Sequence, residues 1–337
     1  MKKENFGYLD IVKFISSIFI IMLHTCLLSD FGETTDWYIS HGVFRLVVPF
    51  FFVTAGFFYG KKILDKKNDV KVVTKNYIIK ILYAFLFWLA IGFPIEFLNT
   101  YDGNFIHTCL LMFQKILFYP WGALWYLSAL MVAIFILSKF YKRGKIVEPV
   151  IIGFMLYLFA LITNSYFFVV SNNNTISKVI EIYNKVFISP RNGIFVGILF
   201  VSLGVLLSKL YIEKKMFSKK TNIFMLIMSY IILMGEIIAV RKNLYMEDNS
   251  LFLSLPLMAF FLVSILIQLK GNKDYSILRK YSIALYLVHR PVLAVMERYF
   301  DLSQGLICFI VCFVITFIIC YILIHINKPF IKKIIMN

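Results

Sequence analysis

The feature that most constrains this chain is a series of apolar runs, each long enough to cross a lipid bilayer as a helix. A bilayer core about 30 Å thick is spanned by about 20 helical residues. Ten runs meet this requirement, at residues 9–29, 43–60, 76–98, 121–140, 147–170, 192–210, 222–240, 250–269, 281–297 and 304–326. Because 61% of the 337 residues are hydrophobic, the sequence predicts an all-α polytopic membrane protein with about ten transmembrane helices. We expect residues 1–337 to form one integral membrane domain.

Basic residues mark one side of this predicted bundle. Lysine and arginine cluster before the first run, after the second, fourth, sixth and eighth runs, and in the C-terminal tail, whereas the first loop on the other side has no lysine or arginine. Cytoplasmic loops of membrane proteins carry this excess, so both termini are predicted to be cytoplasmic. The same rule explains the formal net charge of +17, and no nucleic acid is expected as a partner. The five cysteines have neither metal-site nor disulfide spacing.

Two loops on the predicted outer side are longer than turns. The first contains a semi-polar run at residues 105–118, too short to span the bilayer, which we expect to form an interfacial or re-entrant helix. The second, residues 171–190, is either a lid or an ordinary surface connection.

The first apolar run carries a polar stripe. At about 100° per residue, Asp10, Lys13, Ser17 and His24 fall on one helical face. Ionisable groups inside a membrane are costly and mark functional sites by default. Asp10 and Lys13 lie near the cytoplasmic end of the run, where they either form a salt bridge with each other or take part directly in function. His24 lies near the outer end.

Other unusual polar residues are predicted to reach nearly the same membrane level as His24. They are Arg45, Trp125, Tyr126, Arg191, Asn192 and Glu236, with His289 nearer the middle of the membrane. Aromatic belts and interfacial anchoring offer simpler explanations for the tryptophans and arginines. Their convergence on one level nevertheless favours a substrate-binding or donor-binding site.

The chemistry open to such a set is limited. A histidine can act as a general base toward a hydroxyl group, and guanidinium groups can stabilise an oxyanion or hold a phosphate or carboxylate. The five histidines are scattered without spaced carboxylates, so no metal site is expected. Acyl transfer fits these residues best, and binding of an anionic solute for transport comes next.

Several motifs together resemble the acyltransferase-3 family of integral membrane acyltransferases. The spacing from Lys13 to His24 resembles the family's Arg-x10-His signature, and the segment Arg45-Leu-Val-Val-Pro-Phe-Phe-Phe-Val-Thr-Ala-Gly56 is similar to its second-span motif. The segment Trp121-Gly-Ala-Leu-Trp125-Tyr126-Leu is similar to its aromatic motif, and Ser282-x3-Tyr286-x2-His289 to its late-span motif. These motifs extend in order over nearly the whole chain.

The resemblance implies a reaction and roles for individual residues. Family members transfer an acyl group, commonly from acetyl-CoA, to hydroxyl groups of surface glycans, peptidoglycan or other small acceptors. By that resemblance His24 would be the catalytic base, with Asp10 and Lys13 beside it in the catalytic stripe and Lys13 replacing the usual arginine. Arg45 and Arg191 would hold the donor or the acceptor. Lys13 keeps the charge but loses bidentate geometry, and Ala55 stands where a serine is frequent.

The chain also resembles the membrane half of the membrane-bound serine racemases of vancomycin resistance, in which this half is associated with serine uptake. The residues that carry this likeness are the Asp10 opening, His24-Thr25, the run from Arg45, and Pro190-Arg-Asn-Gly-Ile-Phe. The sequence ends at Asn337, so no racemase activity is expected. We therefore predict a multi-pass bacterial plasma membrane enzyme that contacts lipids, an acyl-CoA donor and a glycan or small hydroxyl acceptor. The alternatives are a carrier for a small amino acid such as serine and a polymer-export or scaffold component.

Overall fold

The computed structural model describes residues 4–244, 248–269, 273–326 and 328–336. Within these ranges the regular elements are all helices, and the predicted all-α class is confirmed. The α-helices are α1 (Gly7–His24), α2 (Glu33–Gly42), α3 (Val47–Ile63), α4 (Val70–Thr100), α5 (Phe105–Phe118), α6 (Trp125–Tyr141), α7 (Glu148–Ile162), α8 (Asn174–Phe187), α9 (Ile198–Ile212), α10 (Lys219–Lys242), α11 (Leu255–Gln268), α12 (Ser276–Phe300), α13 (Gly305–His325) and α14 (Pro329–Ile334). Short turns of 3₁₀ or π type form η1 (Leu27–Phe31), η2 (Phe44–Leu46), η3 (Phe167–Val169) and η4 (Gly193–Gly197).

Each predicted apolar run coincides with a helix. Among the described residues, six helical segments are long and apolar enough to cross a membrane by themselves, at Gly7–His24, Glu33–Ile63, Val70–Thr100, Gly193–Ile212, Lys219–Lys242 and Gly305–His325. The helices α6, α7 and α11 are apolar but shorter, with 17, 15 and 14 residues. The chain is a membrane protein, while the number of crossings and their direction stay predictions.

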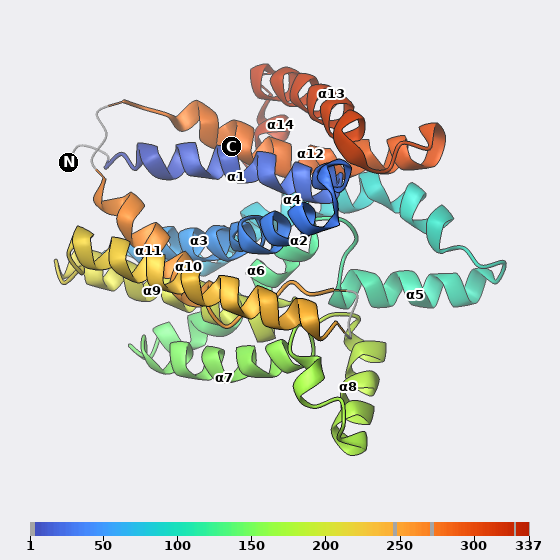
Figure 1. Cartoon of the computed structure of the whole chain (residues 1–337). Coiled ribbons are helices and arrows are strands. Elements are labelled where there is room, and N and C mark those ends of the chain that lie inside the picture. Colours follow the sequence, from blue (N-terminus) through green and yellow to red (C-terminus); the bar gives the residue numbers. More distant parts are fainter. Residues whose placement is uncertain (1–3, 245–247, 270–272, 327, 337) are drawn as a thin grey trace.

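Most helices lie side by side along one direction, as α1, α3, α9, α10, α11 and α12 do in Figure 1, whereas α8 lies across it. We refer to the end of the bundle where α1 begins as the Asp10 end and to the opposite end as the His24 end. The hairpin of α4 and α5 extends outward at the His24 end (Figure 1).

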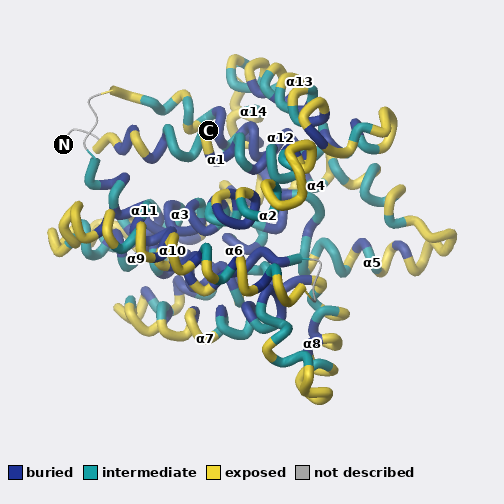
Figure 2. Tube along the Cα trace, in the orientation of Figure 1, coloured by how far each residue is buried: buried dark blue, intermediate teal, exposed yellow. Residues whose placement is uncertain are grey.

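The middle of the bundle is held together by small residues that let two helices touch. Gly56 and Gly60 on α3 face Gly204 and Ser208 on α9, so that a Cβ on Gly56 would lie only 2.2 Å from the carbonyl oxygen of Val201. Such small residues four apart allow backbones to approach closely in membrane bundles. The buried residues concentrate on these inner helices, and the outer faces of α7, α10 and α13 are exposed (Figure 2).

The two long outer-side segments predicted from the sequence are both helical. The run at residues 105–118 forms α5, and residues 171–190 include α8. Asn104 and Asn173 begin them by accepting hydrogen bonds from backbone N–H groups of the first turn. Gln114 of α5 donates hydrogen bonds to the carbonyl oxygens of Lys185 and Val186, so the two segments support each other at the His24 end.

Candidate active site

The polar stripe of α1 packs against α12 along a parallel seam. Asp10, Ser17 and His24 are seven residues apart and share one face of α1, just as Ser282 and His289 share one face of α12. The pairs that meet are Asp10 with Arg279, Ser17 with Ser282, and His24 with His289. The predicted stripe therefore faces protein rather than lipid.

At the Asp10 end the stripe forms an ion pair across the seam. The carboxylate of Asp10, only 3% exposed, lies 3.4 Å from the guanidinium of Arg279. The structure thus pairs Asp10 with Arg279, and among the described residues it forms no salt bridge between Asp10 and Lys13, one of the two roles left open for this pair. The amine of Lys13 lies 4.7 Å from the centre of the Phe58 ring and points toward α3.

In the middle of the seam two serines bind the helices together. The hydroxyls of Ser17 and Ser282 lie 2.7 Å apart. Each hydroxyl oxygen also lies 2.9 Å from the carbonyl oxygen of Lys13, so one hydroxyl donates to the other and the second donates to this carbonyl. Because the backbone oxygen of Lys13 takes part in this group of hydrogen bonds, the seam sets the backbone position of Lys13.

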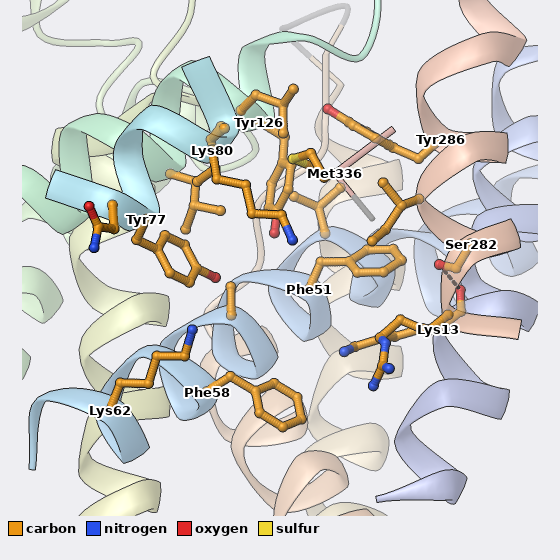
Figure 3. A pocket seen from close by; sticks show the side chains of 18 of the residues that line it. Lys13, Phe51, Phe58, Lys62, Tyr77, Lys80, Tyr126, Ser282, Tyr286 and Met336 are labelled. Carbon is orange, nitrogen blue, oxygen red and sulfur yellow. Dashed lines mark hydrogen bonds between the residues drawn. The ribbon is translucent and has the colours of Figure 1, made fainter. Parts of the chain in front are cut away.

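A large cavity opens beside the seam in the half of the bundle toward the Asp10 end. Its volume is about 480 Å³, within the range of small-molecule sites. Four basic residues line it, namely Lys13, Lys62, Lys80 and Arg279, together with Tyr77, Tyr126, Tyr286 and apolar side chains that include Ile20, Phe51 and Ala55. We refer to it as the basic cavity. Figure 3 shows the amines of Lys13, Lys62 and Lys80 and the hydroxyl of Tyr77 pointing toward its middle.

Aromatic side chains connect the basic cavity to the histidines. The ring of Tyr126 lies 5.7 Å from that of Tyr286, and Tyr286 lies 6.4 Å from His289, measured between ring centres. The hydroxyl of Tyr286 donates to the carbonyl oxygen of Ala123, which fixes its ring. Ile20 lines the cavity one helical turn before His24, so the cavity approaches the histidine pair.

The two histidine rings are stacked, with centres 5.4 Å apart and planes inclined by 30°. Nδ1 of the buried His289 lies 2.9 Å from the carbonyl oxygen of Leu285. Its Nε2 is also buried and has no hydrogen-bond partner among the described residues. One imidazole nitrogen therefore orients the ring, and the other is free to accept a proton or a hydrogen bond.

Around the histidines the charges are positive. Arg290, Arg191 and Arg45 all act electrostatically on His24. Arg290 packs against Gly122, which has a φ of +63° and where a Cβ would lie 3.1 Å from the Cβ of Arg290. Glycine at this position suits both the left-handed backbone and the close approach of Arg290.

Arg45 and Arg191 share one carboxylate, that of Asp248. The distances are 3.0 Å from Arg191 and 3.9 Å from Arg45. The Arg191 guanidinium also lies over the rings of Tyr119 and Trp125, at 5.1 Å and 5.4 Å from their centres. We refer to these three ionised residues as the Arg45–Asp248–Arg191 cluster.

The protonation of Asp248, which lies in the loop between α10 and α11, follows from these neighbours. Burial raises the pKa of its carboxyl group, but the guanidinium groups of Arg191 and Arg45, with hydrogen bonds from Ser250 and Asn164, more than offset this. The pKa of Asp248 therefore lies below its usual value, and the group stays ionised at neutral pH.

Two predicted site residues already have partners within the protein. The side-chain oxygen of Asn192 accepts hydrogen bonds from the backbone N–H groups of Ile194 and Phe195, at 3.0 and 3.1 Å, and so begins η4. The carboxylate of Glu236 accepts from the Tyr166 hydroxyl at 2.6 Å and from both the backbone and the side chain of Ser254. Both residues hold local structure beside the cluster.

The structure thus brings most predicted site residues together in two connected places. Lys13 and Tyr126 line the basic cavity, and His24, His289, Arg45, Trp125 and Arg191 gather at the His24 end. Sequence reasoning missed Asp248, Arg279, Arg290, Lys62 and Lys80. Asp248 could have been found as an acidic residue in a loop that is predicted to lie on the same side of the membrane as Arg45. Within the described ranges, no group of three His, Cys, Asp or Glu side chains is arranged to hold a metal ion.

Comparisons with known proteins confirm the resemblance predicted from the motifs. A family described as "Acyltransferase domain" matches residues 6–325. Two proteins of Enterococcus faecalis, each named "Amino-acid racemase", are 23% and 22% identical over 81% and 88% of this chain. A "Serine/alanine racemase" of Enterococcus gallinarum is 26% identical over 85% of this chain. The alignments cover only 37%, 42% and 40% of these relatives, so the chain spans about two fifths of their length. No solved structure matches the chain.

Proposed function

This chain belongs to the family of membrane acyltransferases whose domain it matches over residues 6–325, and from that premise we propose that it moves an acetyl group from acetyl-CoA to a hydroxyl group of a cell-envelope saccharide. The proposal places the protein in a bacterial plasma membrane. The observation that carries it is the basic cavity and its position one helical turn from His24.

The basic cavity suits a donor that is anionic at one end and long and uncharged at the other. Lys62, Lys80 and Arg279 can pair with nucleotide phosphates. The inner part, lined by Tyr126, Tyr286 and apolar side chains, can take the pantetheine arm. Lys62 and Arg279 lie in or beside the lysine-rich and arginine-rich loops that are predicted to be cytoplasmic. Acetyl-CoA is made in the cytoplasm, so this end of the cavity is on the side from which the donor would come.

In the proposed reaction His24 removes the proton from the acceptor hydroxyl. The oxygen attacks the thioester carbonyl carbon, and a tetrahedral oxyanion forms. The guanidinium groups near His24 stabilise this negative charge electrostatically. When the C–S bond breaks, the coenzyme A thiolate takes the proton from His24, which leaves an O-acetyl ester and free coenzyme A. His289 acts as a positioning residue through its contact with the His24 ring.

Reconstituted membranes test this proposal directly. Purified protein in liposomes should release coenzyme A from labelled acetyl-CoA and place the label on a saccharide acceptor. Replacement His24→Ala should lower this rate at least about 100-fold, the usual contribution of a general base. The control is His325→Ala, because His325 is exposed at the far end of α13. Undiminished turnover in His24→Ala would contradict the assignment.

A second candidate function rests on the relatives. Two are named for amino-acid racemisation and one for serine and alanine, so a carrier for a small amino acid such as serine is the rival. This carrier would need no activated nucleophile. It predicts serine flux into liposomes without acetyl-CoA, and flux that persists in His24→Ala would favour it.

A further inference from the structure

The Arg45–Asp248–Arg191 cluster has one more positive charge than negative, and the two arginines are held differently. Arg191 is 3.0 Å from Asp248, donates from its backbone N–H to the Ser189 hydroxyl at 3.2 Å, and lies over two aromatic rings. Arg45 reaches Asp248 only at 3.9 Å. Its Nε is buried and has no hydrogen-bond partner within the described ranges.

We propose that Arg45 binds a carboxylate group of the acceptor, so that the acceptor is a hydroxyl compound that also carries a carboxylate. This inference rests on the proposed acyl transfer, because it names the class of molecule that offers its hydroxyl to His24. A carboxylate that takes Nε and one terminal nitrogen of Arg45 forms the bidentate pair that guanidinium groups favour.

Charge balance supports this assignment. The cluster holds two guanidinium groups and one carboxylate, while Asp36 acts on Arg45 electrostatically without an ion pair to it, and a buried charge without a partner is costly. A second carboxylate on Arg45 gives two anions for two cations, while Asp248 keeps its shorter contact with Arg191. Asp248 thereby competes weakly for Arg45 and prevents an unpaired charge when the acceptor is absent.

Position supports it as well. Arg45 is one of the charges that act electrostatically on His24, after Arg290 and Arg191, and both residues lie at the same end of the bundle. The Arg45 side chain is 18% exposed and that of Asp248 36%, so the cluster is open to solvent in part, although Nε of Arg45 is itself buried. The basic cavity does not include Arg45, so a carboxylate bound to Arg45 would lie outside the proposed donor site.

The experiment measures ligand binding without acetyl-CoA, by the shift of the thermal unfolding midpoint of purified protein in detergent. The probes are glucuronate against glucose, and L-serine against L-serinamide; in each pair an uncharged group replaces the carboxylate. We expect saturable shifts with the two carboxylates and none with the two partners that lack the carboxylate. Equal shifts within each pair, or no shift with either carboxylate, would overturn the proposal.

Variants distinguish carboxylate recognition by Arg45 from a purely structural role of the cluster. Arg45→Lys should weaken carboxylate binding by about 10-fold or more, because lysine cannot form the bidentate pair. Arg241→Lys is the control, since Arg241 contacts Thr34 and Glu33 instead. Asp248→Asn should tighten binding by several-fold, because the internal competitor for Arg45 is gone. If the cluster is purely structural, Asp248→Asn should not tighten carboxylate binding and Arg45→Lys should not weaken it. Either result would contradict the assignment.

The result also separates this inference from the proposed function. If Asp248→Asn does not fold, the wild-type protein and Arg45→Lys still decide the question. Carboxylate binding without acetyl transfer to any acceptor would retain the Arg45 site and reject the enzyme. Acetyl transfer to a neutral sugar, with no carboxylate binding, would retain the enzyme and reject this inference.

Discussion

The two ends of the α1–α12 seam use the same kinds of residues in opposite ways. At the Asp10 end four basic side chains surround an open cavity, and the buried carboxylate of Asp10 pairs with only one of them. At the His24 end two arginines are held by Asp248, and aromatic rings cover Arg191. Four basic side chains beside open space suit capture of a highly charged ligand. Two guanidinium groups that share one carboxylate suit selective binding of a ligand with a single negative charge.

The largest expected effect comes from filling the basic cavity. Ala55 lines it and is half-buried. Replacement Ala55→Trp should lower acetyl transfer more than about 100-fold, because a donor excluded from its place loses the positioning that the reaction needs. Carboxylate binding at the His24 end should remain unchanged. Parallel turnover and thermal-shift measurements check this, and loss of both activities would show that the two ends are not separate.

The matched control is Ala55→Ser, which adds one hydroxyl group and little volume. It should fold and retain turnover close to that of the wild type, since the wall of an open cavity has room for one added hydroxyl group. A loss in Ala55→Ser as large as in Ala55→Trp would mean that the position matters for a reason other than space.

A smaller effect is expected from the charges at the cavity. Lys80→Glu should raise KM for acetyl-CoA about 10-fold, equivalent to about 1.4 kcal/mol, with little change in kcat. The rise should shrink at high salt, because exposed charges are screened. The control is Lys66→Glu, a reversal in a nearby loop at an exposed residue that does not line the cavity. An equal rise in KM for Lys66→Glu would assign the effect to overall charge.

At the His24 end a moderate effect should appear in kcat alone. His289→Gln removes a ring that stacks on His24 at 5.4 Å, and we expect kcat to fall about 10-fold through loss of positioning. KM for acetyl-CoA should stay unchanged, since His289 does not line the basic cavity. Steady-state kinetics check this split, and a change confined to KM would place His289 in donor binding instead.

Much of the fold was predictable because the bilayer imposes a simple length rule on apolar runs. Each predicted run coincides with a helix, and the short run at residues 105–118 is α5. The polar stripe was predictable for a similar reason, because Asp10, Ser17 and His24 repeat every seven residues on one helical face. Local periodicity therefore identified which side of α1 faces protein.

The partners of the stripe were not predictable, because they depend on which helices pack together. Asp10 meets Arg279 across 269 residues of sequence, and periodicity contains no information on such pairing. Lys62 and Lys80 show a second reason. Lysines on the basic side are sufficiently explained by membrane orientation, and only the fold reveals that these two point into a cavity.

The smallest predicted effect tells most about the difference between the two ends, because the substitution should lower KM for acetyl-CoA rather than raise it. Asp10→Asn removes the negative charge that pairs with Arg279 at 3.4 Å, and so makes the Asp10 end more positive. If this end attracts the phosphates of the donor, KM for acetyl-CoA should fall by about 2- to 3-fold, a modest effect because the Arg279 side of the ion pair is 45% exposed. Asp10→Glu, which keeps the charge, should leave KM unchanged. A rise in KM in Asp10→Asn would mean that Asp10 orients Arg279 toward the donor, and that charge at this end is as carefully paired as at the other.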